Sequence, residues 1–270
     1  MKKYITLLSI ITALAVHADN DIHVNESLSG DYSGESHVDS SWTYAHVTEG
    51  NSVIFSNSDS KTNYTRANFS STRLGSASFR SAILTSAYFD YATLKDTDFT
   101  DATITGVSFH GVKGFTEAQL KSTKSYKEKN LSGINLSNND LSGWDFNGQN
   151  LWKARFQQGT TLTNTDFTDA DLTSAYFGGA ILTNAMFKGA NLTSASFKGA
   201  TLTNADFTDA IVNGTNFYNT VGFTKAQLKS TKSYKEKNLS GVNFQYIEGL
   251  IDFSGLDFSG FNLTSVDFFQ

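Results

Sequence analysis

Large apolar residues recur at every fifth position along most of this chain. A period of five fits neither an α-helix, which repeats every 3.6 residues, nor a β-strand, which alternates every two. These side chains can share one core only if the backbone turns a corner in every repeat. The longest uninterrupted series comprises Leu162, Phe167, Leu172, Phe177, Leu182, Phe187, Leu192, Phe197, Leu202, Phe207, Val212 and Phe217.

A small residue stands two positions before most of these repeat centres. The remaining three positions of each repeat are mostly Ser, Thr, Asn, Asp, Gly and Lys, which suit corners and solvent. Each repeat therefore offers one bulky and one small residue to the interior, which predicts an all-β solenoid. In the longest series the small residues are Ala170, Ala175, Ala180, Ala185, Ala190, Ala195, Ala200, Ala205 and Ala210.

The pattern resembles the pentapeptide-repeat family, whose motif is Ala-(Asp/Asn)-Leu-x-x. Strict matches are Ala67-Asn68-Phe69, Ala170-Asp171-Leu172, Ala190-Asn191-Leu192 and Ala205-Asp206-Phe207. The in-phase repeats cover most of the chain. The resemblance implies a right-handed quadrilateral β-helix with four repeats in each coil.

On that basis residues 64–270 form about ten coils of ~20 residues, a rod on the order of 45–50 Å long at ~4.8 Å per coil. Phe and Leu alternate from Phe69 to Phe99 and from Leu162 to Phe207. Four repeats per coil then predict that Phe stacks on Phe along two opposite faces. Leu stacks on Leu along the other two.

Two interruptions break the repeat, and they are nearly identical. The segment from Gly114 to Leu131 returns as Gly222 to Leu239, and the same offset maps Phe69 onto Phe177. The solenoid therefore reads as two related modules, about 64–171 and 172–270, with four residues added in the second. The spacing from Phe109 to Leu131 is close to one coil, so we expect each insertion to form one modified coil.

Each insertion carries the sequence signals of a helix start. Thr116 can cap a helix, with Gln119 three residues on, and Phe115 can pack on Leu120. Thr224 and Gln227 repeat the signal, which predicts short helices near 114–130 and 222–238. The lysines of the first insertion form either an anion-binding patch or a solvated face, and the solvated face is the better interpretation. They are Lys121, Lys124, Lys127 and Lys129.

The N-terminus reads as a secretory signal peptide over residues 1–18. Lys2 and Lys3 precede the apolar run from Tyr4 to Val16, and a small residue, Ala18, marks the expected cut. We expect export to the periplasm, the cell surface or the extracellular space. No second apolar run is long enough to predict a membrane span in the mature chain.

The two ends of the solenoid differ. Residues 19–63 lack the five-residue register and read as a strand-rich cap or irregular segment, because a solenoid end exposes a sheet edge. The strand-forming residues there are Trp42, Tyr44, Val47, Val53, Ile54 and Phe55. The sequence stops at Phe268-Phe269-Gln270, on a core position. Either the last coil pairs end to end with a second copy, or a continuation is missing.

Composition excludes several kinds of chemistry. The chain has no Cys, which excludes thiol catalysis, disulfides and cysteine-ligated metals, and it also has no Pro. The net charge of −5 becomes −7 without Lys2 and Lys3, because 26 acidic residues then face 19 basic ones. Such a balance disfavours direct binding of nucleic acid.

The residues that carry chemistry form no known constellation. The five histidines, at 17, 23, 37, 46 and 110, have no regular ligand spacing. The repeat motif itself places Asp at outward and corner positions, so close Asp pairs are interpreted as turn caps and not as acid–base groups. No nucleophile elbow, phosphate loop or dinucleotide fingerprint occurs. We expect no enzymatic activity, no cofactor and no metal. The Asp pairs are Asp96/Asp98, Asp169/Asp171 and Asp206/Asp209.

Threonine ladders are the candidate binding feature of the repeat surface. A Thr follows the Leu of alternate repeats, which places a ladder on each of two opposite faces. Flat threonine arrays can bind ice or crystalline polysaccharide, although Thr also suits a half-exposed strand. The residues are Thr163, Thr173, Thr183, Thr193 and Thr203.

Three functions compete at this stage. The first is a non-catalytic exported structural or protein-interaction scaffold, whose partner is an unknown protein or a cell-surface polymer. The second follows from the resemblance, since some pentapeptide-repeat proteins mimic DNA and bind topoisomerases; export and the small net charge oppose it. The third is binding of ice or polysaccharide through the threonine ladders.

Overall fold

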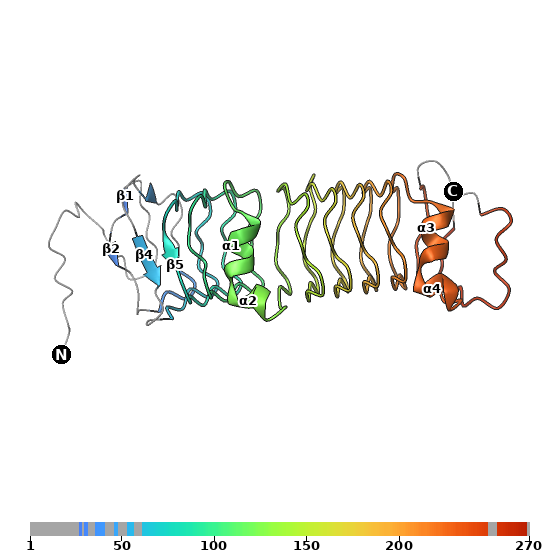
Figure 1. Ribbon diagram of the computed structural model, residues 1–270, viewed down its shortest axis with the longest axis horizontal. Coiled ribbons are helices and arrows are strands. Elements are labelled where there is room, and N and C mark those ends of the chain that lie inside the picture. The colour runs from blue at the N-terminus through green and yellow to red at the C-terminus, as the bar shows by residue number, and fades with distance from the viewer. Residues whose placement is uncertain are drawn as a thin grey trace.

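The chain forms an elongated β-solenoid whose coils stack along the long axis of the molecule (Figure 1). The structure, a computed structural model, describes residues 27–28, 30–31, 36–40, 46–47, 53–56, 61–247 and 253–268. The predicted signal peptide, Trp42 and Tyr44 lie outside the described residues. None of the helices among the described residues has the length and apolar character needed to cross a bilayer.

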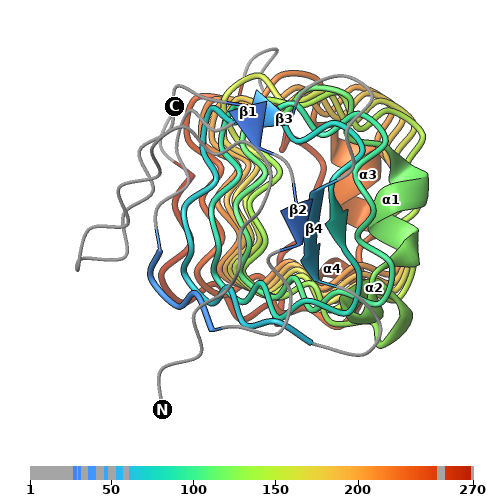
Figure 2. The same ribbon diagram turned by 90° about the vertical axis from the view of Figure 1, so that its left-hand side faces the viewer.

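One regular coil consists of four five-residue repeats. Parallel β-bridges join Thr161 to Ile181 and Ile181 to Thr201, and the same spacing holds on the other faces. Seen along the long axis, successive coils lie one behind another (Figure 2). Backbone hydrogen bonds run from each coil to the next, as from Phe187 N–H to the Asp206 carbonyl oxygen at 2.7 Å. This hydrogen bonding explains why a chain with so many repeats contains no Pro, which lacks the N–H donor.

Most faces contribute only one or two residues to the pairing, so the named strands are few and short. They are β1 (Ser27–Leu28), β2 (Gly30–Asp31), β3 (His46–Val47), β4 (Val53–Ser56) and β5 (Ser78–Phe79). β1 pairs in parallel with β3, and β2, β4 and β5 form a parallel sheet in that order.

The described part of the N-terminal segment continues the same parallel stack. β4 contains Val53, Ile54 and Phe55, and β3 contains Val47, as the sequence predicted. Phe55 is buried, and its ring stacks on Phe79 with centroids 4.6 Å apart. The core column therefore begins before the five-residue register becomes visible in the sequence.

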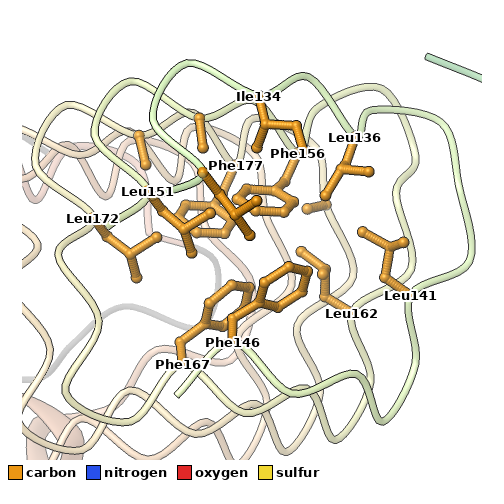
Figure 3. Close-up of a cluster of buried hydrophobic side chains, with 14 of the residues drawn as sticks. Ile134, Leu136, Leu141, Phe146, Leu151, Phe156, Leu162, Phe167, Leu172 and Phe177 are labelled. Atoms are coloured by element: carbon orange, nitrogen blue, oxygen red, sulfur yellow. The ribbon is translucent and has the colours of Figure 1, made fainter. Parts of the chain in front are cut away.

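Two columns of phenylalanine rings form the centre of the core, as predicted (Figure 3). Rings one coil apart stack in parallel, for example Phe177 on Phe197 at 4.9 Å and 4°. Rings of the two columns meet edge to face, as Phe177 meets Phe187 at 5.8 Å and 85°. Both arrangements are favoured by the ring quadrupole. Every centre from Leu162 to Phe217 is fully buried.

The polar positions of the repeat shape the corners. The residue two places after each centre has a positive φ, for example 57° at Asn184 and 68° at Gly189. This left-handed conformation costs least for Gly and is tolerated by Asn and Asp. Where the residue before the centre is Asp or Asn, its side chain caps the turn, as the Asp171 carboxylate accepts a hydrogen bond from Thr173 N–H at 3.1 Å.

Both insertions contain two short helices, which confirms the helix prediction. They are α1 (Glu117–Ser122), α2 (Lys124–Lys127), α3 (Lys225–Ser230) and α4 (Lys232–Lys235). α1 and α3 lie on the same side of the solenoid (Figure 2). The capping boxes of Thr116 with Gln119 and of Thr224 with Gln227 are both present.

Side chains of the first insertion attach it to the coil before it. Gln119 Nε2 donates hydrogen bonds to the carbonyl oxygens of Leu94 and Thr97, both at 2.8 Å. Phe115 stacks on Phe109 with ring centroids 4.6 Å apart. The helix therefore continues the core of the solenoid rather than standing apart from it.

The expectation that Phe109 and Leu131 bound one modified coil is wrong. Ser108 pairs with Asn135, which is 27 residues further along the chain, and Asn216 pairs with Asn243 at the same spacing. Phe109 N–H accordingly donates to the Asn135 carbonyl oxygen at 2.8 Å, which brings Phe109 beside Leu136. A helix rises only about 1.5 Å per residue against about 3.3 Å for a strand, so more residues are needed to cross one face.

The second module has the extra residues that the sequence indicated. Asn130 pairs with Asn150, one regular coil away. The equivalent Asn238 pairs with Asn262 instead, so this coil is four residues longer than its counterpart in the first module.

Candidate binding faces

No catalytic group assembles on the described surface. A group of three or more His, Cys, Asp or Glu side chains that could hold a metal does not occur among the described residues. Asp90, Ser108 and His110 lie on neighbouring coils, but Ser108 Oγ donates its hydrogen bond to the Asp90 carboxylate. The His110 Nε2 atom shares a hydrogen bond with the Tyr91 hydroxyl at 2.9 Å instead. Ser108 is therefore not paired with a histidine base that could activate it as a nucleophile.

The Asp pairs act as turn caps and ion-pair partners. Asp98 accepts a hydrogen bond from Thr100 N–H at 2.8 Å, and Asp206 accepts one from Thr208 N–H at 2.8 Å. Asp209 pairs with Lys235 at 2.7 Å, and the hydrogen bond from this ammonium group lowers the pKa of the Asp209 carboxyl. A carboxyl group that acts as a general acid at neutral pH needs a raised pKa, whereas the pKa of Asp209 is lowered.

The five predicted threonines fall into two columns with different hydrogen bonding. Thr173 Oγ1 donates to Asp171 at 2.6 Å, and Thr193 Oγ1 donates to Asn191 at 2.7 Å. The hydroxyls of this column are therefore committed within the protein. Their role in binding a ligand stays a prediction.

The other column belongs to a face that carries no charge over three coils. Here the residue before the centre is Thr or Ile, which lacks the carboxylate or amide oxygen that caps the turn in the opposite column. The Thr, Ile and Asn side chains of this face that are named below are half-buried or exposed. We call it the threonine face; it comprises Thr161, Thr163, Asn164, Ile181, Thr183, Asn184, Thr201, Thr203 and Asn204.

The lysines of the insertions are largely tied to carboxylates. Lys127 pairs with Asp101 at 2.7 Å, and Lys121 pairs with Glu117 at 2.9 Å. Both lysines contact solvent, and such surface pairs contribute little to stability. These pairs favour a solvated face over an anion-binding patch.

A cluster of aromatic and basic side chains covers another face and the turn at Trp152 and Lys153 that leads into it, and sequence reasoning missed it. Trp152 is 45% exposed and Tyr176 is 38% exposed. The Nζ atom of Lys153 lies 4.2 Å from the centre of the Trp152 ring. We call this cluster the tyrosine–cation strip; it comprises Trp152, Lys153, Arg155, Tyr176, Lys198 and Tyr218. The missed signal is that Arg155 and Tyr176 occupy outward positions one coil apart.

Sequence profiles described as "Pentapeptide repeats" match this chain throughout the two repeat runs. One profile matches residues 65–101, 82–113, 130–168 and 185–221, and a second matches residues 151–201. Together they cover more than half of the sequence. The chain belongs to the pentapeptide-repeat family.

Solved structures of other pentapeptide-repeat proteins are similar to this chain at low identity. HetL, from the cyanobacterium Nostoc sp. strain PCC 7120 and involved in heterocyst differentiation regulation, is 22% identical, with 81% of this chain and 84% of HetL covered and a TM-score of 0.32. QnrB1, a plasmid-mediated fluoroquinolone resistance protein, is 14% identical, with 88% and 92% covered and a TM-score of 0.32. No curated protein matches the sequence.

Proposed function

We propose that this pentapeptide-repeat protein is a non-catalytic binding scaffold that works outside the cytoplasm. The proposal rests on the observation that the charged and polar side chains are largely engaged within the protein itself. Among the described residues, the Asp and Asn side chains before the centres cap turns, and charged groups near the helices pair with each other. What remains for other molecules is a long regular surface on a rigid core.

Two further features belong to the proposal. The coil is right-handed and quadrilateral, which is supported by four repeats per coil and by the strong preference of parallel crossovers for the right hand. The location is the periplasm, the cell surface or the extracellular space, which is supported by the signal-peptide pattern of residues 1–18.

The DNA-mimic alternative finds less support. A mimic of duplex DNA needs a continuous negative face, whereas the tyrosine–cation strip presents Lys153, Arg155 and Lys198. The whole chain carries a net charge of only −5.

Expression of the full chain with a C-terminal tag in a Gram-negative bacterium tests the proposal. We expect the tagged protein in the exported fraction with Asp19 as its first residue. Chemical cross-linking before purification then identifies what the surface contacts, and a panel of hydrolase and transferase substrates checks for turnover. Retention in the cytosol with an intact N-terminus would contradict the location. A reproducible turnover would contradict the non-catalytic assignment.

A further inference from the structure

The tyrosine–cation strip carries basic side chains that have no acidic partner among the described residues. Several basic side chains elsewhere lie against carboxylates, as Arg80 lies 3.1 Å from Asp98 and Lys235 lies 2.7 Å from Asp209. Lys153, Arg155 and Lys198 make no such ion pair with any carboxylate of the described residues. From Leu136 to Phe244, no Asp or Glu stands immediately before or after the core residues of this face, which over these coils are Leu136, Phe156, Phe177, Phe197, Phe217 and Phe244.

The strip follows the long axis of the solenoid. Bridges join Arg155 to Tyr176, Tyr176 to Ser196, and Ser196 to Asn216, so successive coils place their outward residues in one row. At ~4.8 Å per coil, the three steps from Arg155 to the coil of Tyr218 span roughly 14 Å. The fixed backbone pairing holds this row in place without any ligand.

Two cation–ring pairs lie on this face, the first formed by residues that precede their core centres and the second by residues that follow theirs. Arg155 lies 6.0 Å from the centre of the Tyr176 ring, and Lys198 lies 5.2 Å from that of Tyr218. With the pair of Lys153 and Trp152, three of the four cation–ring contacts among the described residues occur here. Each cation retains hydrogen-bond donors for a second partner, because a ring occupies only one side of it.

We propose that the tyrosine–cation strip binds an acidic polysaccharide along the axis of the solenoid. A sugar ring has an apolar face that can stack on an exposed tyrosine or tryptophan, which presents an apolar body beside a polar group. Carboxylates on the same polymer complement Arg155 and Lys198, and Arg can bind a carboxylate through two hydrogen bonds. The lack of acidic residues next to the core positions beneath the strip completes the charge complementarity.

A polysaccharide fits the chain better than a single-stranded nucleic acid does. Both polymers combine stacking with negative charge. Nucleic acid, however, carries a charge at every nucleotide and draws its affinity from many cations, whereas the strip has three and the whole chain is net negative. A nucleic-acid ligand is therefore the outcome against which the proposal is tested.

The test measures binding of the full chain to three probes by isothermal titration at low and moderate salt. The probes are polygalacturonate, the neutral polymer dextran, and oligo-dT. We expect polygalacturonate to bind, with weaker binding at higher salt, and the other two to bind at least tenfold more weakly. The double variant Arg155→Gln/Lys198→Gln and the single variant Tyr176→Ala should each weaken polygalacturonate binding by at least tenfold.

The same face supplies the matched control. Tyr88 and Tyr91 are 46% and 56% exposed, but they lie beside Asp90 and outside the strip. The variant Tyr88→Ala/Tyr91→Ala should bind polygalacturonate as the unaltered protein does. All substituted side chains lie on the surface, so circular dichroism should be unchanged in every variant.

Three results would overturn the inference: no binding of polygalacturonate, equal losses in the strip and control variants, or preferential binding of oligo-dT. The inference rests on the proposed binding function, yet the two can fail separately. If the protein is exported but does not bind polygalacturonate, only the assignment of the strip is contradicted. Cytosolic retention contradicts only the proposed location.

Discussion

Phe187→Ala is expected to destabilise the protein by about 3–5 kcal/mol, the largest effect of any single substitution considered for this chain. Phe187 is fully buried, stacks between Phe167 at 5.2 Å and Phe207 at 5.1 Å, and meets Phe177 and Phe197 edge to face. Backbone hydrogen bonds between coils hold the chain in place, so the cavity left by the missing ring cannot collapse. Urea unfolding followed by circular dichroism measures the loss.

The neighbouring outward residue is the control for this experiment. Met186 is 38% exposed on the same repeat, so Met186→Ala should change the free energy of unfolding by no more than about 0.5 kcal/mol. Equal losses for the two variants would mean that Phe187 is not a core residue.

Gly222→Ala should cost about 2–5 kcal/mol, because a conformational penalty and a steric penalty combine at this position. Gly222 has a φ of 76°, and an added Cβ would lie 3.0 Å from the backbone N and Cα of Thr203. The left-handed conformation costs about 1–2 kcal/mol for a residue with a side chain, and overpacking typically adds about 1–3 kcal/mol. Gly222 begins the second helical insertion, so the turn into α3 depends on it.

Gly179→Ala separates the two penalties. Gly179 has a φ of 69°, close to that of Gly222, but a Cβ added there would meet nothing within 4 Å. Only the conformational cost of about 1–2 kcal/mol should appear. If the two glycine variants lost the same stability in urea unfolding, close approach to Thr203 would play no part.

The core of this fold could be predicted from the sequence because one physical constraint repeats. Every fifth residue must be apolar to reach the interior, so the positions of Phe177, Phe187 and Phe197 and their stacking follow from counting. The capping boxes at Thr116 and Thr224 were predictable for a similar reason, since they are local and need only residues three apart.

The longer, helix-containing coils were not predictable in the same way. Their length depends on how many helical residues replace a strand across one face, and the sequence spacing from Phe109 to Leu131 does not encode that. The continuation of the core to Phe55 was hidden too, because a single ring carries no period.

The tyrosine–cation strip illustrates the limit for the candidate site. Outward positions are free of the core constraint, so Arg155, Tyr176 and Lys198 form no regular series in the sequence. They come to lie on one face only when the coil length stacks residues from successive coils. The threonine ladders were visible because they repeat at every second centre, but the commitment of Thr173 to Asp171 required the structure.

A pair of engineered cysteines tests the coil length, on which all of these assignments depend. Ser196 and Asn216 are paired across neighbouring coils, at a separation of about 4.8 Å that suits a disulfide. Because the chain has no Cys, Ser196→Cys/Asn216→Cys should form an intramolecular disulfide on mild oxidation, detected by mass spectrometry. Ser196→Cys/Asp206→Cys, two repeats apart on opposite faces, should remain reduced. Cross-linking of the pair two repeats apart, in place of the pair four repeats apart, would contradict a coil of four repeats.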